Sequence, residues 1–221
     1  MKTVVITGAN GGIGLEFVLH YLKLGCRVYA LCRKSNDALN NTDACVVEGV
    51  DLTDERSFPL FCEQLRDVEI DILINNAGVF LNEQLGKIEY QTIMDQFLIN
   101  AIAPLKVTEI LLKQLSADAK VAMITSRMGS IADNGSGQYY GYRASKAALN
   151  ALGVSLAHDL KGRGIWVGLL HPGYVKTKMT GYAGDIEPKA SVAGLTAIID
   201  DRASLENTGR FWHSNGEFLP W

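Results

Sequence analysis

Residues 3–14 read Thr-Val-Val-Ile-Thr-Gly-Ala-Asn-Gly-Gly-Ile-Gly, and this stretch decides the fold. A short β-branched run ends at Thr7, and glycines follow at positions 8, 12 and 14. Because glycine has no Cβ, such a turn lets the backbone come close to a ligand where the next helix begins. The stretch therefore predicts a strand, a tight turn and a helix, with a phosphate group bound at the turn.

The alternation of short apolar runs and helical patterns continues along the chain. The runs that predict strands are Thr3–Thr7, Arg27–Leu31, Ala44–Val50, Ile70–Asn75, Lys120–Thr125, Ile165–His171 and Arg210–His213. The segments that predict helices are Gly12–Leu24, Asp54–Asp67, Tyr90–Leu115, Tyr142–Lys161 and Ser191–Asp200. Strands that are apolar throughout are typical of a parallel sheet covered on both faces. We therefore expect one α/β domain over residues 1–221, a doubly wound (Rossmann) parallel sheet of about seven strands with ligands bound beyond the strand C-termini.

The composition is that of an ordinary globular protein. Of the 221 residues, 48% are hydrophobic and 20% are charged, and the formal net charge is −3. No basic block indicates nucleic-acid binding, and no apolar run has the length of a signal peptide or a membrane span. The four cysteines form no C-x-x-C pair, and the four histidines lack ligand spacing. We expect a cytoplasmic protein that binds no nucleic acid, spans no membrane and holds no metal.

The glycine turn has the spacing G-x-x-x-G-x-G. It follows a strand and opens a helix, which is the context that dinucleotide binding requires. A glycine-rich turn without a ligand is the alternative. The turn residues that we expect at the cofactor are Gly8, Asn10, Gly12, Ile13 and Gly14.

The end of the second strand indicates which dinucleotide binds. A carboxylate at this place typically holds the ribose 2′-hydroxyl of NAD, but this chain has Arg33 followed by Lys34. A guanidinium suits a 2′-phosphate, so the sequence favours NADP(H) over NAD. A solvated basic pair on a loop is the alternative.

Two further strand ends carry candidate adenosine contacts. Asp51 can accept a hydrogen bond from the adenine amino group, or it can cap the helix near Asp54. The small residues of Asn75-Asn76-Ala77-Gly78 let a backbone approach an adenosine, and a plain turn explains them as well. The candidates from these ends are Asp51, Leu52, Asn76, Ala77 and Gly78.

A proline interrupts the helical pattern of Tyr90–Leu115. Pro104 lacks the N–H that would bond the Asn100 carbonyl four residues earlier. A buried unpaired carbonyl costs about 1–3 kcal/mol, and an ordered water is its natural partner. We therefore predict a water on the Asn100 carbonyl, with an ordinary proline kink as the alternative.

Tyr142 and Lys146 lie four residues apart, so on a helix they share one face. Tyr174 and Lys178 have the same spacing in a loop, so the spacing alone is weak evidence. Only Tyr142 opens a long helix and follows a strand that ends near a serine, Ser126. In isolation, a tyrosine at such a position is more often a core residue, and a lysine more often has its ammonium group in solvent.

Together these residues resemble the classical short-chain dehydrogenase/reductase family. By that resemblance, Asn100, Ser126, Tyr142 and Lys146 form the catalytic tetrad, and Tyr142 and Lys146 also contact the cofactor. The Pro-Gly-x-x-x-Thr loop of the family implies cofactor contacts from Pro172, Gly173, Val175 and Thr177, with Thr177 at the nicotinamide carboxamide. The runs around Ser126 and Tyr142 and the Gly216–Trp221 ending look most like the C-factor and sniffer-type carbonyl reductase branch.

The sequence departs from the family pattern at two places. Ser126 lies sixteen residues before Tyr142, which is longer than usual, so Ser130 is the alternative serine. Asn10 stands where NADP-preferring relatives often place a basic residue, so cofactor preference rests mainly on Arg33.

The resemblance implies hydride transfer between NADP(H) and a carbonyl or alcohol substrate, with Tyr142 as general acid/base. We expect the tyrosine pKa to fall below its usual value near 10, through the Lys146 ammonium and oxidised nicotinamide. Ser126 would hold the substrate oxygen, and the water on Asn100 would connect Lys146 to solvent. The alternative is a dinucleotide-binding signalling or regulatory protein of C-factor type with weak or no turnover.

The resemblance also implies a homodimer that pairs the helices over Tyr90–Leu115 and Tyr142–Lys161. The family usually places a substrate lid at Lys178–Lys189, and glycines and a proline there predict mobility. Its few apolar side chains do not identify the small-molecule substrate.

Overall fold

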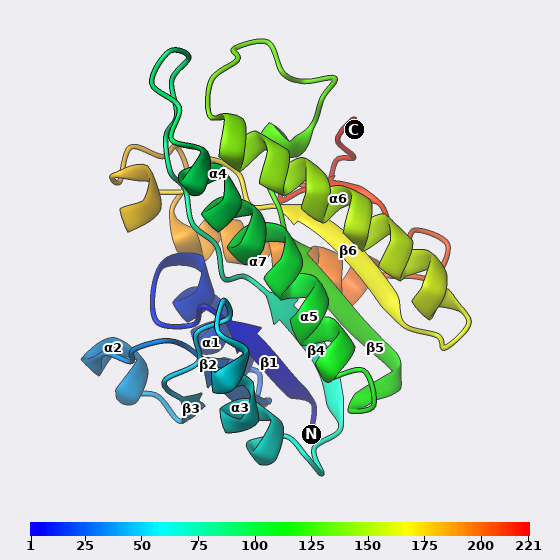
Figure 1. The fold of residues 1–221 in the computed structure, drawn as a ribbon. Helices are drawn as coiled ribbons and strands as arrows, with labels where there is room; N and C mark the ends of the chain where they lie inside the picture. The colour runs from blue at the N-terminus through cyan, green and yellow to red at the C-terminus, as the bar shows by residue number, and fades with distance from the viewer.

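Seven parallel strands form one sheet in the order β3-β2-β1-β4-β5-β6-β7 in a computed structural model, which describes residues 1–221 (Figure 1). The strands are β1 Thr3–Thr7, β2 Arg27–Leu31, β3 Cys45–Val47, β4 Ile70–Asn75, β5 Leu115–Ile124, β6 Trp166–His171 and β7 Phe211–His213. The α-helices are α1 Gly12–Lys23, α2 Asp37–Asn40, α3 Phe58–Gln64, α4 Tyr90–Phe97, α5 Ala103–Ile110, α6 Tyr140–Lys161 and α7 Pro188–Ala197. The prediction of a doubly wound parallel sheet is confirmed.

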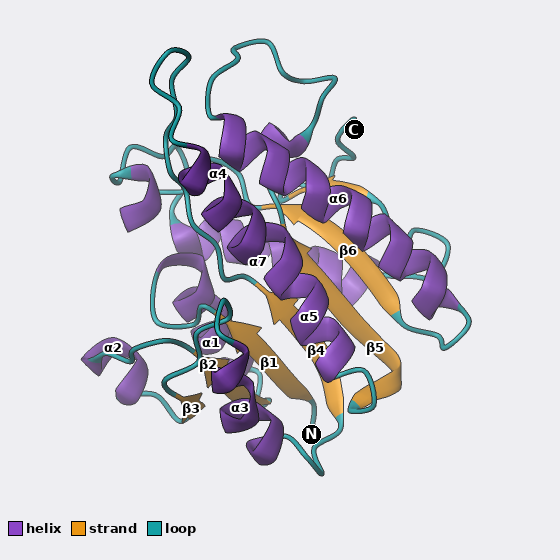
Figure 2. Ribbon diagram, in the orientation of Figure 1, coloured by secondary structure: helices purple, strands orange, loops and turns teal.

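Helices cover both faces of the sheet (Figure 2). On one face, Phe17 of α1 and Leu195 of α7 pack on alternate side chains of the central strands. On the other face, Phe61 of α3, Val107 of α5 and Leu149 of α6 do the same. The strands are buried from both sides, which explains why their sequences are apolar without alternation.

The segment predicted as one helix over Tyr90–Leu115 is three elements. After α4 the helix widens into a π-helical turn, η2 (Leu98–Ile102), and α5 ends at Ile110. Leu115 already belongs to β5, where it pairs with Ile70, so the strand starts five residues before the predicted Lys120. Pro104 follows this π turn as the second residue of α5, so the helix is irregular next to the position of the missing N–H.

Other boundaries differ by a few residues. The Asp54–Asp67 prediction becomes a 3-10 turn, η1 (Glu55–Ser57), followed by α3. The helix predicted at Ser191 starts three residues earlier because Pro188 suits the first turn of a helix, and it runs into a π turn, η5 (Ile198–Arg202). Helix α2, a single turn capped by Asn36, was not predicted from the sequence.

The strand order reverses between β1 and β4, which are neighbours in the sheet. The connections from these two strands therefore leave in opposite directions and open a crevice at their carboxyl ends, where this fold class binds ligands. None of the helices combines the length and the apolar character that crossing a membrane would require.

Candidate active site

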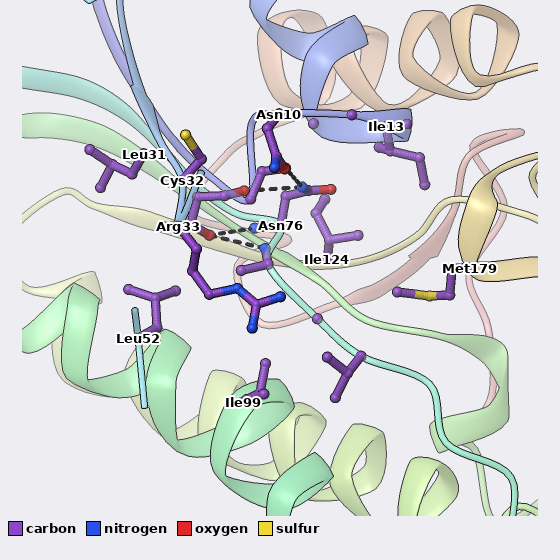
Figure 3. A pocket seen from close by; sticks show the side chains of 18 of the residues that line it. Asn10, Ile13, Leu31, Cys32, Arg33, Leu52, Asn76, Ile99, Ile124 and Met179 are labelled. Atoms are coloured by element: carbon purple, nitrogen blue, oxygen red, sulfur yellow. Dashed lines mark hydrogen bonds between the residues drawn. The ribbon is translucent and has the colours of Figure 1, made fainter. Parts of the chain in front are cut away.

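A pocket of about 490 Å³ lies beyond the carboxyl ends of the central strands (Figure 3). The predicted site residues among its lining are Gly8, Asn10, Gly12, Ile13, Gly14, Arg33, Asp51, Leu52, Asn76, Ala77, Gly78, Tyr142, Lys146, Pro172 and Thr177. The predicted residues outside the lining are Asn100, Ser126, Gly173 and Val175. The pocket thus joins the glycine turn at one end to Tyr142 and Lys146 at the other.

The glycine turn is packed against the end of β4. Gly8 has φ +64°, and a Cβ placed on it would lie 2.8 Å from the Cα of Ala77. The Asn76 side-chain amide donates to the carbonyls of Thr7 at 3.0 Å and Gly8 at 3.1 Å. A Cβ on Gly14 would lie 2.2 Å from the Gly8 carbonyl oxygen. The small residues of both motifs are therefore required to bring two strand ends together, besides any contact with a ligand.

Gly14→Ala is expected to lower the free energy of unfolding by about 1–3 kcal/mol, because the new Cβ meets backbone that cannot move aside cheaply. Urea unfolding without added cofactor measures the change. Gly11→Ala is the matched control: Gly11 has an extended φ of 178°, and a Cβ there meets nothing within 4 Å. Equal destabilisation by the two changes would contradict this account.

Helix α1 begins at the turn with free backbone donors. No side chain caps its first turn, and that turn holds no acidic residue. The positive end of the helix dipole and its first N–H groups therefore face the pocket, which suits a pyrophosphate.

Arg33 extends into the pocket from the loop after β2 (Figure 3). Two amides hold that loop to the glycine turn: Asn10 donates to the Lys34 carbonyl at 2.7 Å, and Asn36 donates to the Asn10 carbonyl at 2.6 Å. Asn10 thus braces the loop that carries Arg33.

Asp51 lines the pocket, and its Oδ1 accepts hydrogen bonds from the Thr53 amide at 2.9 Å and hydroxyl at 2.7 Å. These bonds, assisted by the charge of Arg33, lower the pKa of the Asp51 carboxyl. The capping role weighed for Asp51 belongs to Asp54, whose Oδ1 accepts from the Arg56 amide at the start of η1.

Asn100 is fully buried in the π turn η2 and does not line the pocket. Its Oδ1 accepts from the Val79 amide at 2.8 Å, and its Nδ2 donates to the Val79 carbonyl at 2.9 Å and to Ser145 Oγ at 3.0 Å. The side chain therefore joins the loop after β4 to α6. The water on the Asn100 carbonyl stays a prediction.

Tyr142 lies in the first turn of α6, where the ring of Phe80 meets its ring edge-to-face at 4.9 Å. Burial raises the pKa of its phenol to about 12, and the nearby Ser126 side chain has a smaller effect that lowers it. Ser130 instead accepts from the Asp133 amide at 3.1 Å. Of the two serines, Ser126 is the one beside Tyr142.

Lys146 is buried one turn further along α6. Its Nζ lies 5.8 Å from the centre of the Tyr142 ring and donates to the Ile124 carbonyl at 2.9 Å. Burial lowers the pKa of Lys146 to about 7. In the chain without cofactor, desolvation dominates the pKa values of both groups. The expected fall of the tyrosine pKa, which also depends on oxidised nicotinamide, stays a prediction.

The Pro172–Thr177 loop approaches the pocket from β6. Pro172 and Thr177 line it, and a Cβ on Gly12 would lie 3.2 Å from the Thr177 methyl carbon. Val175 is buried and forms a β-bridge with Ile186, which folds the predicted lid segment back onto this loop. Met179 of that segment lines the pocket as well.

Sequence reasoning missed several lining residues, among them Thr7, Asn36 and Val79. Thr7 Oγ1 accepts from the amides of Asn76 and Ala77, both at 3.0 Å. A polar residue that ends an apolar strand was the available signal for Thr7. Asn36 and Val79 carried no such signal, since only the folded loops bring them to the pocket.

Known proteins resemble this chain in sequence and in fold. The family model for short chain dehydrogenases matches residues 2–187. A dehydrogenase of Rhodococcus sp. strain AD45, named for 1-hydroxy-2-glutathionyl-2-methyl-3-butene, is 38% identical over 227 residues and 100% of both chains. The C-signal protein of Myxococcus xanthus is 44% identical over 155 residues, 69% of this chain and 93% of that one.

A solved structure agrees in fold over the whole chain. It is the NADPH-bound carbonyl reductase from chicken fatty liver, at 30% identity and a TM-score of 0.91, covering 100% of this chain and 99% of that chain. The resemblance drawn from the sequence, including its C-factor and carbonyl reductase branch, is confirmed by these matches. The chain belongs to the short-chain dehydrogenase family of oxidoreductases.

Proposed function

We propose that the protein is an NADP(H)-dependent carbonyl reductase, with Tyr142 as its general acid/base. The observation that carries the proposal is that one pocket is lined by Arg33 at one end and by Tyr142 and Lys146 at the other. This arrangement suits a dinucleotide that carries a 2′-phosphate and presents its reactive ring to a proton donor.

The residues present fit NADP(H). The start of α1, whose first turn no side chain caps, would hold the pyrophosphate, and the glycines bring that turn close to Ala77 and Thr177 at the pocket. Arg33 would pair with the 2′-phosphate, and Thr177 would bind the nicotinamide carboxamide. NADPH supplies the hydride for reduction. The NADPH-bound chicken reductase supports this choice of cofactor.

The proton needed by the substrate oxygen comes from Tyr142. Ser126 lies beside the phenol and would hold the substrate oxygen within its reach. The phenol with a pKa near 12 must lose its proton more readily for reversible transfer at neutral pH. A protonated Lys146 would supply part of that stabilisation, and the positive charge of oxidised nicotinamide the rest.

The alternative of a signalling protein without turnover is not adopted. Its support is the C-signal relative, whereas the Rhodococcus relative and the chicken reductase are both named as enzymes. The half-buried Tyr142 and the buried Lys146 at the pocket have no evident use in a protein that only binds dinucleotide.

Calorimetric titration with NADPH and NADH, followed by a panel of ketones and aldehydes monitored at the nicotinamide absorbance, tests the proposal. We expect tighter binding of NADPH and reduction of at least one compound. Failure of both dinucleotides to bind would reject the role of the glycine turn. Binding without reduction of any panel compound would favour the signalling alternative.

A further inference from the structure

Helix α6, which carries Tyr142, has an unusual start. Gln138 and Tyr139 both have left-handed backbone, with φ +56° and +54°. Such conformations are costly for residues other than glycine. Tyr139 is the residue before the helix, and its side chain makes no capping hydrogen bond. The first turn therefore needs an acceptor from elsewhere in the chain.

Glu83 supplies that acceptor from the loop between β4 and α4. Its carboxylate is buried, at 2% exposure, and Oε2 accepts from the Gly141 amide at 3.1 Å. Oε1 accepts from Gln96 Nε2 at 2.5 Å, and the Thr92 hydroxyl lies 2.9 Å from the same oxygen. The Gly141 amide and the Gln96 amide nitrogen can only donate, and an anion at a helix N-terminus is favourable. Because no ion pair includes Glu83, the helix end and these donors offset the cost of burying it.

The fit around this carboxylate is close. A Cβ on Gly141 would lie 2.4 Å from Gln96 Nε2, 2.7 Å from Glu83 Oε1 and 2.9 Å from the Cα of Ile93. The start of α6 therefore approaches α4 as closely as glycine allows, with the Glu83–Gln96 pair between the two helices.

Two amides one helical turn apart hold the loop that carries Glu83. Gln96 accepts from the Leu81 amide at 2.8 Å, and Asn100 binds both the amide and the carbonyl of Val79. Asn100 also reaches Ser145 on α6. The first turns of α6 are thus held at Gly141 by Glu83 and at Ser145 by Asn100.

Tyr142 lies between these two points. Phe80, in the same loop as Glu83, packs against the rings of both Tyr142 and Tyr139. A shift of the Glu83 loop would therefore move both the helix that carries Tyr142 and the ring against which Tyr142 packs.

We propose that Glu83, held by Gln96, is a positioning residue that sets Tyr142 against Ser126 by capping α6. This rests on the proposed function, since it concerns the placement of the proton donor. Glu83 does not line the pocket, and it acts through Gly141 and Phe80.

Glu83→Gln tests the proposal, because it keeps the size of the side chain but turns a donor toward groups that are themselves donors. We expect kcat for alcohol oxidation with NADP⁺ to fall about 10-fold or more, while the KM for NADP⁺ stays within about two-fold. For alcohol oxidation, kcat should rise with pH as the Tyr142 phenol loses its proton. With the phenol held less well against Ser126, its pKa should be higher, and this rise should move to higher pH. Thr92→Val removes one donor and should give a smaller shift in the same direction.

The control is Glu89→Gln, the same change at an exposed residue whose side chain makes no capping bond. Amide hydrogen exchange of the peptide over 140–146, followed by mass spectrometry, measures how well the first turns of α6 are held. This measurement does not depend on enzyme activity. Exchange should accelerate in Glu83→Gln and not in Glu89→Gln.

Unchanged exchange, or a loss of activity with the wild-type pH profile, would overturn the positioning role. If the wild-type chain reduces no carbonyl compound and oxidises no alcohol, the proposed function fails. The exchange measurement then still decides whether Glu83 caps α6.

Discussion

Tyr142→Phe is expected to lower the turnover of any carbonyl substrate by about 10²–10⁴-fold, the usual contribution of a positioned proton donor. The change removes only the hydroxyl, so the ring keeps its edge-to-face contact with Phe80. The glycine turn and Arg33 are untouched, so the NADPH dissociation constant should stay within about two-fold of the wild-type value. Steady-state kinetics and calorimetry of the same preparations measure the two effects.

Tyr174→Phe is the control for this experiment. Tyr174 belongs to the other Tyr-x-x-x-Lys spacing in the chain, and its side chain is 49% exposed. It should retain most of the turnover. Substantial carbonyl reduction by the Tyr142→Phe variant would remove Tyr142 from the acid role.

Arg33→Ala is expected to weaken NADPH binding about 10–100-fold, as the loss of a charge-assisted hydrogen bond to phosphate of about 1.5–3 kcal/mol implies. NADH, which lacks the 2′-phosphate, should change by no more than about two-fold. Calorimetric titration of both dinucleotides at one salt concentration gives the comparison, because salt screens this interaction.

Lys34→Ala distinguishes the two basic residues after β2. The Lys34 carbonyl is held by Asn10, a contact that the substitution keeps, and the side chain is exposed. A small effect on NADPH is therefore expected. Equal loss of NADPH and NADH affinity in the Arg33→Ala variant would reject the 2′-phosphate assignment and favour a solvated basic loop.

The ends of helices and strands are the features that the local sequence pattern predicts least well. The stretch from Tyr90 to Leu115 has a helical pattern, yet its last residue pairs with Ile70 in the sheet. A sequence pattern cannot show which partner a short apolar run will find, since pairing depends on chain that is distant in sequence. In the same way, Pro104 predicts a disturbed helix but does not specify a π turn.

In the candidate site too, the sequence pattern identifies residues, whereas the fold decides their properties. Spacing selects Tyr142 and Lys146, but their pKa values depend on burial, which raises one and lowers the other in the folded chain. The water on Asn100, the mobile lid and the homodimer stay predictions.

The sequence by itself determined the family, the parallel sheet and the chemical identity of the candidate residues, because short motifs and apolar runs are local properties of the chain. Only the tertiary structure decided how these residues are held. Thr7 and Asn76 tie two strand ends together across 69 positions, and Glu83 caps a helix 58 positions away. Buried polar groups must find partners wherever the fold brings them, and a linear pattern does not record that pairing.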